Sequence, residues 1–215
     1  FLDQLITNYG INLIKSAVLI ANGNVSKTNY VKKVIDSNDY FISIDAKSEN
    51  LKELGVQPNL ILGDLDSATI DELDSKIEVV ELSDQNKTDL EKSLDYCKEN
   101  SIKKVVILGS TGLREDHSMA NVLIASTYSD ILQIELITNY YRIIFVRENT
   151  KISAHNVPVS IISLSSDNKI TTRGLKYDLN NEKLKSFSHG ISNEVNGDSF
   201  TVKAESTIIV FIGIK

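Results

Sequence analysis

Short apolar runs alternate with helical patterns over the first part of the chain. The runs fall at residues 17–21, 40–44, 60–62, 77–82, 105–108 and 131–138. Runs with so few polar residues are typical of strands that are covered on both faces of a sheet. Between them, apolar residues recur at helical spacing around Val31, Leu51, Leu90 and Leu123. Alternating strands and helices predict a mostly parallel, Rossmann-like α/β sheet.

The pattern changes after residue 141, where short apolar strands are separated by turn residues. These strands are predicted at residues 143–146, 152–154, 157–164, 169–172, 199–203 and 207–212. No long amphipathic pattern interrupts them, so we predict a small all-β sandwich or barrel. We therefore expect an α/β domain over residues 1–142 and a β domain over residues 143–215. So small a β segment has little core of its own, and we expect it to pack on the first domain or on a second copy.

Two carboxylates follow the apolar run that ends at Gly63. Asp64 and Asp66 are separated by one residue, so the predicted strand would deliver both to its carboxyl end. Two aspartates in that position can share a Mg²⁺ ion that is held against phosphates. Asp and Ser are also good helix N-caps, so the same residues could simply start a short helix. A calcium-binding loop fits poorly, because Ser75 stands where the closing Glu is needed.

A second candidate lies at the start of the helix around Leu90. Thr88 and Glu91 have the spacing of a capping box, which predicts Thr88 as the N-cap and Asp89 as the first helical residue. Both residue types favour a helix start whatever the function. The functional alternative is that Asp89 also faces the cleft and supplies a third carboxylate.

The exit of the predicted strand 105–108 is rich in small residues and then in charged ones. Glycines at 109 and 112 allow backbone N–H groups to approach a phosphate, and the helix that follows favours an anion at its N-terminus. The segment is neither a P-loop nor a dinucleotide-binding motif. Arg114 can bind a phosphate with two N–H groups, and Asp116 can orient Arg114 or His117, or assist a metal.

Composition limits the classes of function. The 215 residues carry a net charge of −6, which argues against a general nucleic-acid binder. No apolar run is long enough to cross a bilayer, so no membrane partner is expected. Cys97 is the only cysteine, and no signal peptide is apparent. These observations lead us to expect a cytoplasmic protein.

Four segments in sequence resemble the motifs of the thiamine pyrophosphokinase family. Residues 58–67 resemble the family pattern Pro-Asp-x-x-x-Gly-Asp-x-Asp-Ser, and residues 85–89 resemble its Thr-Asp helix start. Residues 109–117, followed by Asn121, are similar to Gly-x-x-Gly-x-Arg-x-Asp-His. Residues 190–194 resemble its carboxyl-terminal Ser-Asn-Glu element. The matches keep their order and spacing from about residue 21 to the C-terminus.

The resemblance implies an enzyme that transfers pyrophosphate from ATP to the thiamine hydroxyl, with Mg²⁺, in a homodimer that binds thiamine at the subunit junction. It implies catalytic roles for Asp64, Asp66, Asp89, Arg114 and Asp116, of which the first three would hold the metal. The residues matching nucleotide-facing loops are Asn22, Gly23, Asp45, Gln85, Thr88, Ser110, Thr111 and Arg114. Ser192 and Asn193 match residues near the thiamine ring.

The chain departs from the family after its second predicted strand. The family carries Asp-Gly-Gly-Ala there, whereas this chain has Asp-Ala-Lys-Ser at residues 45–48. Two alternatives to the thiamine reaction stay open. One is a pyrophosphokinase acting on another heterocyclic alcohol, such as a pterin. The other is a non-catalytic nucleotide- or thiamine-binding module.

Overall fold

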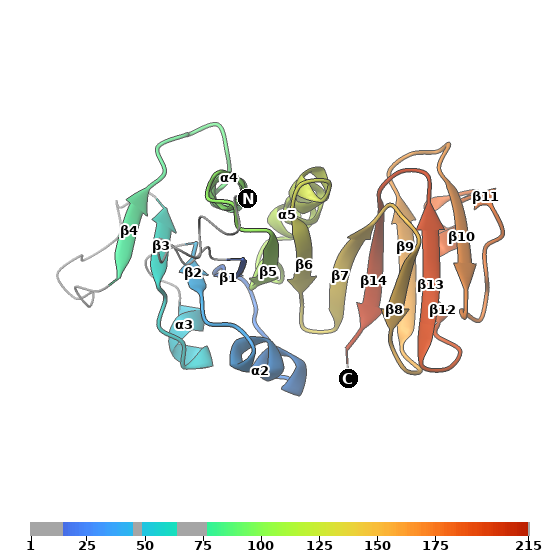
Figure 1. Ribbon diagram of the computed structural model, residues 1–215, viewed down its shortest axis with the longest axis horizontal. Coiled ribbons are helices and arrows are strands. Elements are labelled where there is room, and N and C mark those ends of the chain that lie inside the picture. The colour runs from blue at the N-terminus through green and yellow to red at the C-terminus, as the bar shows by residue number, and fades with distance from the viewer. Residues whose placement is uncertain (1–14, 45–48, 64–76, 215) are drawn as a thin grey trace, which may run out of the picture.

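The computed structural model describes residues 15–44, 49–63 and 77–214, and the account below concerns these residues. The α/β part is built around one run of parallel strands (Figure 1). Its strands are β1 (Ser16–Ile20), β2 (Phe41–Ser43), β3 (Leu60–Gly63), β4 (Glu78–Glu81), β5 (Lys104–Leu108) and β6 (Gln133–Ile137). Its helices are α2 (Asn29–Asp36), α3 (Glu49–Leu54), α4 (Asp89–Glu99) and α5 (Glu115–Tyr128). The predicted mostly parallel α/β sheet is confirmed.

The second part consists of short antiparallel strands, as the change of pattern after residue 141 predicts. They are β7 (Tyr141–Val146), β8 (Thr150–Ser153), β9 (Pro158–Ser163), β10 (Lys169–Arg173), β11 (Glu182–Lys183), β12 (Asn193–Glu194), β13 (Ser199–Ala204) and β14 (Ile208–Gly213). A 3-10 helix, η3 (Phe187–Gly190), precedes β12. The sequence pattern did not predict β11, η3 or β12, because two to four residues are too few to show a period.

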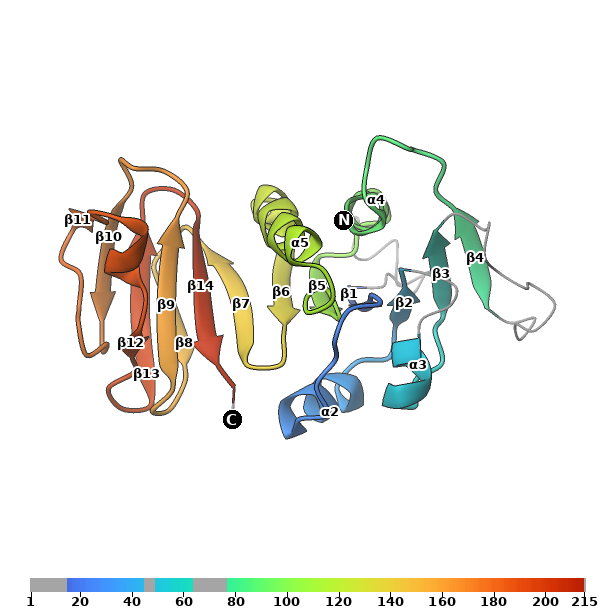
Figure 2. The same cartoon turned by 180° about the vertical axis from the view of Figure 1, so that it is seen from behind.

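One sheet runs through both parts of the chain. Its ten described strands have the order β12-β9-β14-β7-β6-β5-β1-β2-β3-β4, and a second sheet has the order β11-β10-β13-β8. The strands from β4 to β6 are parallel, and β7 then pairs with β6 in the antiparallel direction. The division at residues 142 and 143 falls inside β7, so the hydrogen-bonded sheet continues across it. Figure 2 shows this continuity from behind.

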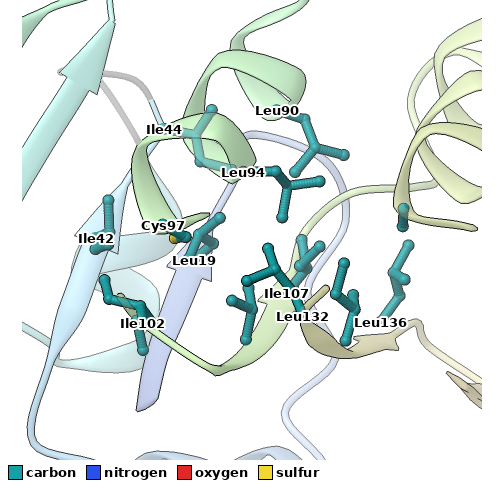
Figure 3. Close-up of a cluster of buried hydrophobic side chains, with 14 of the residues drawn as sticks. Leu19, Ile42, Ile44, Leu90, Leu94, Cys97, Ile102, Ile107, Leu132 and Leu136 are labelled. Atoms are coloured by element: carbon teal, nitrogen blue, oxygen red, sulfur yellow. The ribbon is translucent and has the colours of Figure 1, made fainter. Parts of the chain in front are cut away.

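Side chains alternate between two layers of helices. On β1, Ala17 and Leu19 face the core beneath α4 and α5, while Val18 and Ile20 face α2 and α3. This alternation follows from the two-residue period of a strand. Figure 3 shows Leu90, Leu94 and Cys97 of α4 lying over Leu19 and Ile107 of the sheet. A separate core, which includes Phe200 and Val210, fills the space between the two sheets of the β domain.

A partly buried polar network ties the two parts together. The Tyr30 hydroxyl donates to Glu135 Oε1 at 2.7 Å, and Arg142 Nη1 donates to the same hydroxyl at 3.4 Å. Arg142 Nη2 also reaches the Ser153 carbonyl oxygen, at 3.3 Å. Burial, followed by the Glu135 carboxylate, raises the pKa of Tyr30. The network joins α2, β6, β7 and β8, so it limits rotation of one part against the other.

We predict that Leu94→Ala destabilises the fold by about 2–5 kcal/mol, because it leaves a cavity in the α4 core. Leu94 is 0% exposed. The matched control is Leu164→Ala, which removes the same atoms from a side chain that is 56% exposed and should change stability by no more than about 0.5 kcal/mol. Urea unfolding followed by circular dichroism measures both variants. Equal losses of stability in the two variants would contradict the burial of Leu94 in the core beneath α4.

Candidate active site

A cavity of about 370 Å³ lies beyond the carboxyl ends of β1 and β5. These two strands are neighbours in the sheet. Strand β1 pairs with β2 along one of its edges and with β5 along the other. The strand order therefore reverses between them. In open α/β sheets this point leaves a crevice that ligands fill, because the two connections diverge to opposite faces.

Two strand-exit loops form the floor of the cavity. The Gly23 N–H donates to the Gly109 carbonyl oxygen at 2.6 Å, and the Asn24 N–H donates to the Thr111 carbonyl oxygen at 2.8 Å. A Cβ atom on Gly23 would overlap the carbonyl oxygens of Gly109 and Thr111. Gly109 also has a φ of +68°, which side chains disfavour. Both glycines are therefore required by the close approach of the two loops.

Side chains from two helices hold these loops in place. Asn50 of α3 donates from Nδ2 to the carbonyl oxygens of Ala21 and Gly23, at 2.6 and 2.8 Å. Asn121 of α5 donates from Nδ2 to the Ser110 carbonyl oxygen at 2.8 Å. The loops are thus fixed from both faces of the sheet, so their peptide groups keep one orientation toward the cavity.

Eight of the residues that the sequence assigned to the nucleotide or metal line this single cavity. They are Asn22, Gly23, Gln85, Thr88, Asp89, Ser110, Thr111 and Arg114. They come from three segments that are far apart in the chain, and parallel strands bring them to one edge of the sheet. Asp45, Asp64 and Asp66 lie outside the described residues.

The cavity has features that suit an anion. The Ser110 hydroxyl is buried and has no hydrogen-bond partner among the described residues. A buried hydroxyl without a partner is costly, so a ligand that bonds it would be favoured. Helix α4 begins at the cavity, with Thr88 as N-cap accepting from the Glu91 N–H at 3.3 Å. The positive end of its dipole therefore points at any bound phosphate.

Asp89 is already paired with a residue that the sequence analysis missed. Lys92 lines the same cavity, and its Nζ lies 2.7 Å from Asp89 Oδ1. Within the described ranges, no three acidic, histidine or cysteine side chains gather to hold a metal ion. A carboxylate such as that of Asp89 suits Mg²⁺, and the other two predicted ligands, Asp64 and Asp66, are not described.

Arg114 and Asp116 form a bidentate ion pair at the start of α5. Arg114 Nη2 lies 2.7 Å from Asp116 Oδ2, and Nε lies 3.1 Å from Oδ1. The hydrogen bond from Arg114, and then one from the His117 backbone N–H, lower the pKa of Asp116 to about 2. Asp116 is not among the lining residues, but it orients Arg114, which is. Of the roles that the sequence left open, this contact fits the orientation of Arg114.

The cavity contains further residues that sequence reasoning did not assign. They are Lys87, Lys92, Leu113, His117, Ser118 and Asn121. Ser118 accepts from the Gly112 N–H at 3.1 Å and donates to the Arg114 carbonyl oxygen at 2.7 Å. Lys87 is bonded to Asp95 Oδ2 at 2.6 Å, and Tyr128 donates to the other oxygen of Asp95 at 2.9 Å. For Lys92, the three-residue spacing from Asp89 on a helix was the available signal.

The residues assigned to thiamine lie at the far edge of the sheet. Ser192 precedes β12 and has a φ of +60°, which is uncommon for a residue other than glycine. The Asn193 amide is used by the chain itself, because Oδ1 accepts from the Tyr177 N–H at 3.0 Å and Nδ2 donates to the Tyr177 carbonyl oxygen at 2.7 Å. Asn193 therefore has a structural role in joining β12 to the preceding loop.

The two predicted binding regions are well separated within one chain. Six strand spacings divide β12 from β1, which amounts to roughly 29 Å across the sheet at about 4.8 Å each. Neither Ser192 nor Asn193 is among the described residues that line the cavity. A ligand of ordinary size cannot touch both regions of the same chain.

The Arg114–Asp116 contact predicts a carboxyl group that titrates abnormally low. A lowered pKa in the folded state means that the ion pair is present above the ordinary pKa of Asp, about 3.9, and is lost as the pH falls through about 2. Carbon-detected NMR titration of Asp116 should give a value near 2, and Arg114→Met should return it toward 3.9. A normal value in the unmodified protein would contradict the ion pair.

The chain is similar to known proteins along most of its length. Residues 31–136 match the model of the thiamin pyrophosphokinase catalytic domain, and residues 146–209 match that of the thiamin pyrophosphokinase vitamin B1 binding domain. Thiamine pyrophosphokinase of Bacillus subtilis is 26% identical over 211 residues, covering 93% of this chain and 98% of that protein. Thiamin pyrophosphokinase 1 of Caenorhabditis elegans is 29% identical over 184 residues, covering 74% and 71%.

Solved structures agree with the fold. The crystal structure of the Bacillus subtilis thiamine pyrophosphokinase has a TM-score of 0.80 at 25% identity, and covers 94% of this chain and 100% of that one. Thiamin pyrophosphokinase from Candida albicans has a TM-score of 0.74 at 18% identity, with coverage of 94% and 90%. No helix in the described part of the chain is long and apolar enough to span a membrane. From both of its matched domains and its sheet topology, the chain belongs to the thiamin pyrophosphokinase family.

Proposed function

We propose that the chain transfers a pyrophosphoryl group from ATP to the primary hydroxyl of thiamine, which gives thiamine pyrophosphate and AMP. One observation carries the proposal. Eight residues assigned to the nucleotide and metal on sequence grounds surround one cavity at the point where the strand order reverses. The family models support the choice of reaction, since they cover both a catalytic and a vitamin B1 binding domain.

The proposed reaction is a displacement at the β-phosphorus of ATP. The thiamine hydroxyl oxygen forms a bond to this phosphorus and loses its proton, and the bond from the phosphorus to the oxygen bridging to the α-phosphorus breaks. AMP leaves with that oxygen. Such transfers depend on positioning and charge neutralisation rather than on covalent help from the protein.

The lining of the cavity offers what this reaction needs. In the proposal, the N-terminus of α4 and the Ser110 hydroxyl bind phosphate oxygens, and Gly23 and Gly109 keep the two loops below them in close contact. Arg114 donates to the transferred group, and Asp116 holds the guanidinium in a fixed orientation.

Asp64, Asp66 and Asp89 are the residues proposed to hold Mg²⁺. When bound, this ion would neutralise charge on the phosphate oxygens. The family uses ATP, and oxygen-rich carboxylate sites suit Mg²⁺.

We propose that the active species is a homodimer in which the β domain of one chain completes the cavity of the other. The roughly 29 Å between β12 and β1 supports this, because the thiamine residues of one chain cannot reach its own cavity. Apolar side chains are exposed near Ser192, including Tyr177 at 65% and Phe187 at 70%. Exposed apolar side chains gathered in one region are typical of an interface.

Incubation of the purified protein with ATP, Mg²⁺ and thiamine tests the reaction, with a control that lacks thiamine. Chromatography should detect AMP and thiamine pyrophosphate in equal amounts. AMP formation only with a pterin or another alcohol would support the pyrophosphoryl transfer but would replace thiamine as the acceptor. Saturable ATP or thiamine binding without AMP from any acceptor would instead identify a binding module.

Two substitutions at Ser192 distinguish backbone strain at this position from thiamine binding by its hydroxyl. Ser192→Ala and Ser192→Gly both remove the hydroxyl, and both should raise KM for thiamine about tenfold, the loss of one good hydrogen bond. Glycine adopts positive φ without penalty, so Ser192→Gly should be more stable than Ser192→Ala by about 1 kcal/mol. Steady-state kinetics and urea unfolding give the two quantities. An unchanged KM in both variants would remove Ser192 from the thiamine site.

A further inference from the structure

Lys92 is a buried lysine on the wall of the cavity. Its side chain is 7% exposed, and its ammonium lies 2.7 Å from Asp89 Oδ1, three residues earlier on α4. The same nitrogen donates to the Leu82 carbonyl oxygen at 3.2 Å, just after β4. The ammonium therefore contacts protein oxygens from two different segments.

The two partners of this ion pair differ in exposure. The Asp89 side chain is 47% exposed, whereas Lys92 is almost completely buried. Burying a lysine is costly unless an opposite charge and hydrogen-bond acceptors compensate for the lost water. A half-exposed carboxylate does not need such a partner for its own sake. The pairing therefore has its clearest consequence at the cavity, where it fixes the orientation of the Asp89 carboxylate.

We infer that Lys92 is a positioning residue that holds the Asp89 carboxylate in one orientation on the cavity wall, and that ATP binding depends on this orientation. The inference rests on the proposed function, because it takes ATP as the anion. Without Lys92, the half-exposed Asp89 carboxylate would be free to adopt other rotamers beside the bound nucleotide. Lys92 thus acts on the nucleotide through Asp89.

The contacts favour this indirect role over direct binding of phosphate by Lys92. Its ammonium already bridges Asp89 and Leu82, and only 7% of the side chain is exposed. Arg114, by comparison, has a side chain that is 65% exposed and lines the same cavity. Direct binding of phosphate by Lys92 predicts an effect that does not depend on Asp89, and a double-mutant cycle distinguishes the two roles.

The test measures ATP binding by calorimetry in the presence of Mg²⁺ and without thiamine, so that no turnover occurs. Lys92→Met should raise Kd for ATP about tenfold in the otherwise unmodified protein. In an Asp89→Asn background, the same substitution should change Kd less than about twofold, because the carboxylate that Lys92 positions is gone. The matched control is Lys98→Met, which removes an exposed lysine from the same helix and should leave Kd within twofold.

Three results would overturn the inference. They are an unchanged Kd in Lys92→Met, an equal effect of Lys98→Met, and a tenfold loss that persists in the Asp89→Asn background. The last result would assign Lys92 to direct contact with the nucleotide. If Lys92→Met does not fold, Lys92→Gln takes its place in the cycle, because it keeps a donor for the Leu82 carbonyl and lacks the charge.

The experiments distinguish failure of the proposed reaction from failure of the inference about Lys92. ATP binding by the unmodified protein without any transfer to an acceptor would refute the reaction, while the cycle would still test Lys92. Absence of saturable ATP binding by the unmodified protein would overturn both the proposed reaction and the role of Lys92.

Urea unfolding adds a readout that needs no ligand. Asp89→Ala should lose more stability than Lys92→Met, since it leaves a buried charge unpaired, and the reverse order would contradict the role of the pair.

Discussion

The close contact between two strand-exit backbones is the constraint on which the candidate active site depends. Gly23 and Gly109 let the loops after β1 and β5 lie against each other, with carbonyl oxygens where a Cβ atom would otherwise stand. Because the strand order reverses at these two strands, the loops diverge beyond the contact and leave a hollow. Asn50 and Asn121 then hold the loops from opposite faces of the sheet. The geometry of the cavity is thus determined by backbone contacts before any ligand arrives.

The continuous sheet has a second effect on this site. Since β7 pairs with β6, the β domain is an extension of the catalytic sheet, and the Tyr30–Glu135–Arg142 network adds a bonded contact on one face. Relative motion of the two parts would break backbone hydrogen bonds as well as this network. In the proposed dimer, each β domain would therefore present its β12 edge from a rigid support.

Much of the fold could be predicted from the sequence, because parallel strands buried on both faces appear as continuous apolar runs. The family resemblance supplied the residues expected at the nucleotide, and eight of them line one cavity because the carboxyl ends of parallel strands share one edge. Lys92 and Asn50 were not assigned to it. The three-residue spacing of Lys92 from Asp89 was the one local signal, whereas the contacts of Lys92 with the Leu82 carbonyl and of Asn50 with the exit of β1 arise only in the folded chain. Asn193 matched a ligand residue, yet its amide binds the Tyr177 backbone, a contact that only the folded loop creates.

The separation of β12 from the cavity has a genetic consequence. If each working site combines the cavity of one chain with the β12 edge of another, each chain contributes to two sites, one in each role. A chain altered at Asp89 and a chain whose β12 edge no longer binds thiamine would both be inactive as homodimers. In a mixed dimer they would restore one intact site out of two. Two defective alleles in one cell could then complement each other, even though neither encodes a functional protein by itself.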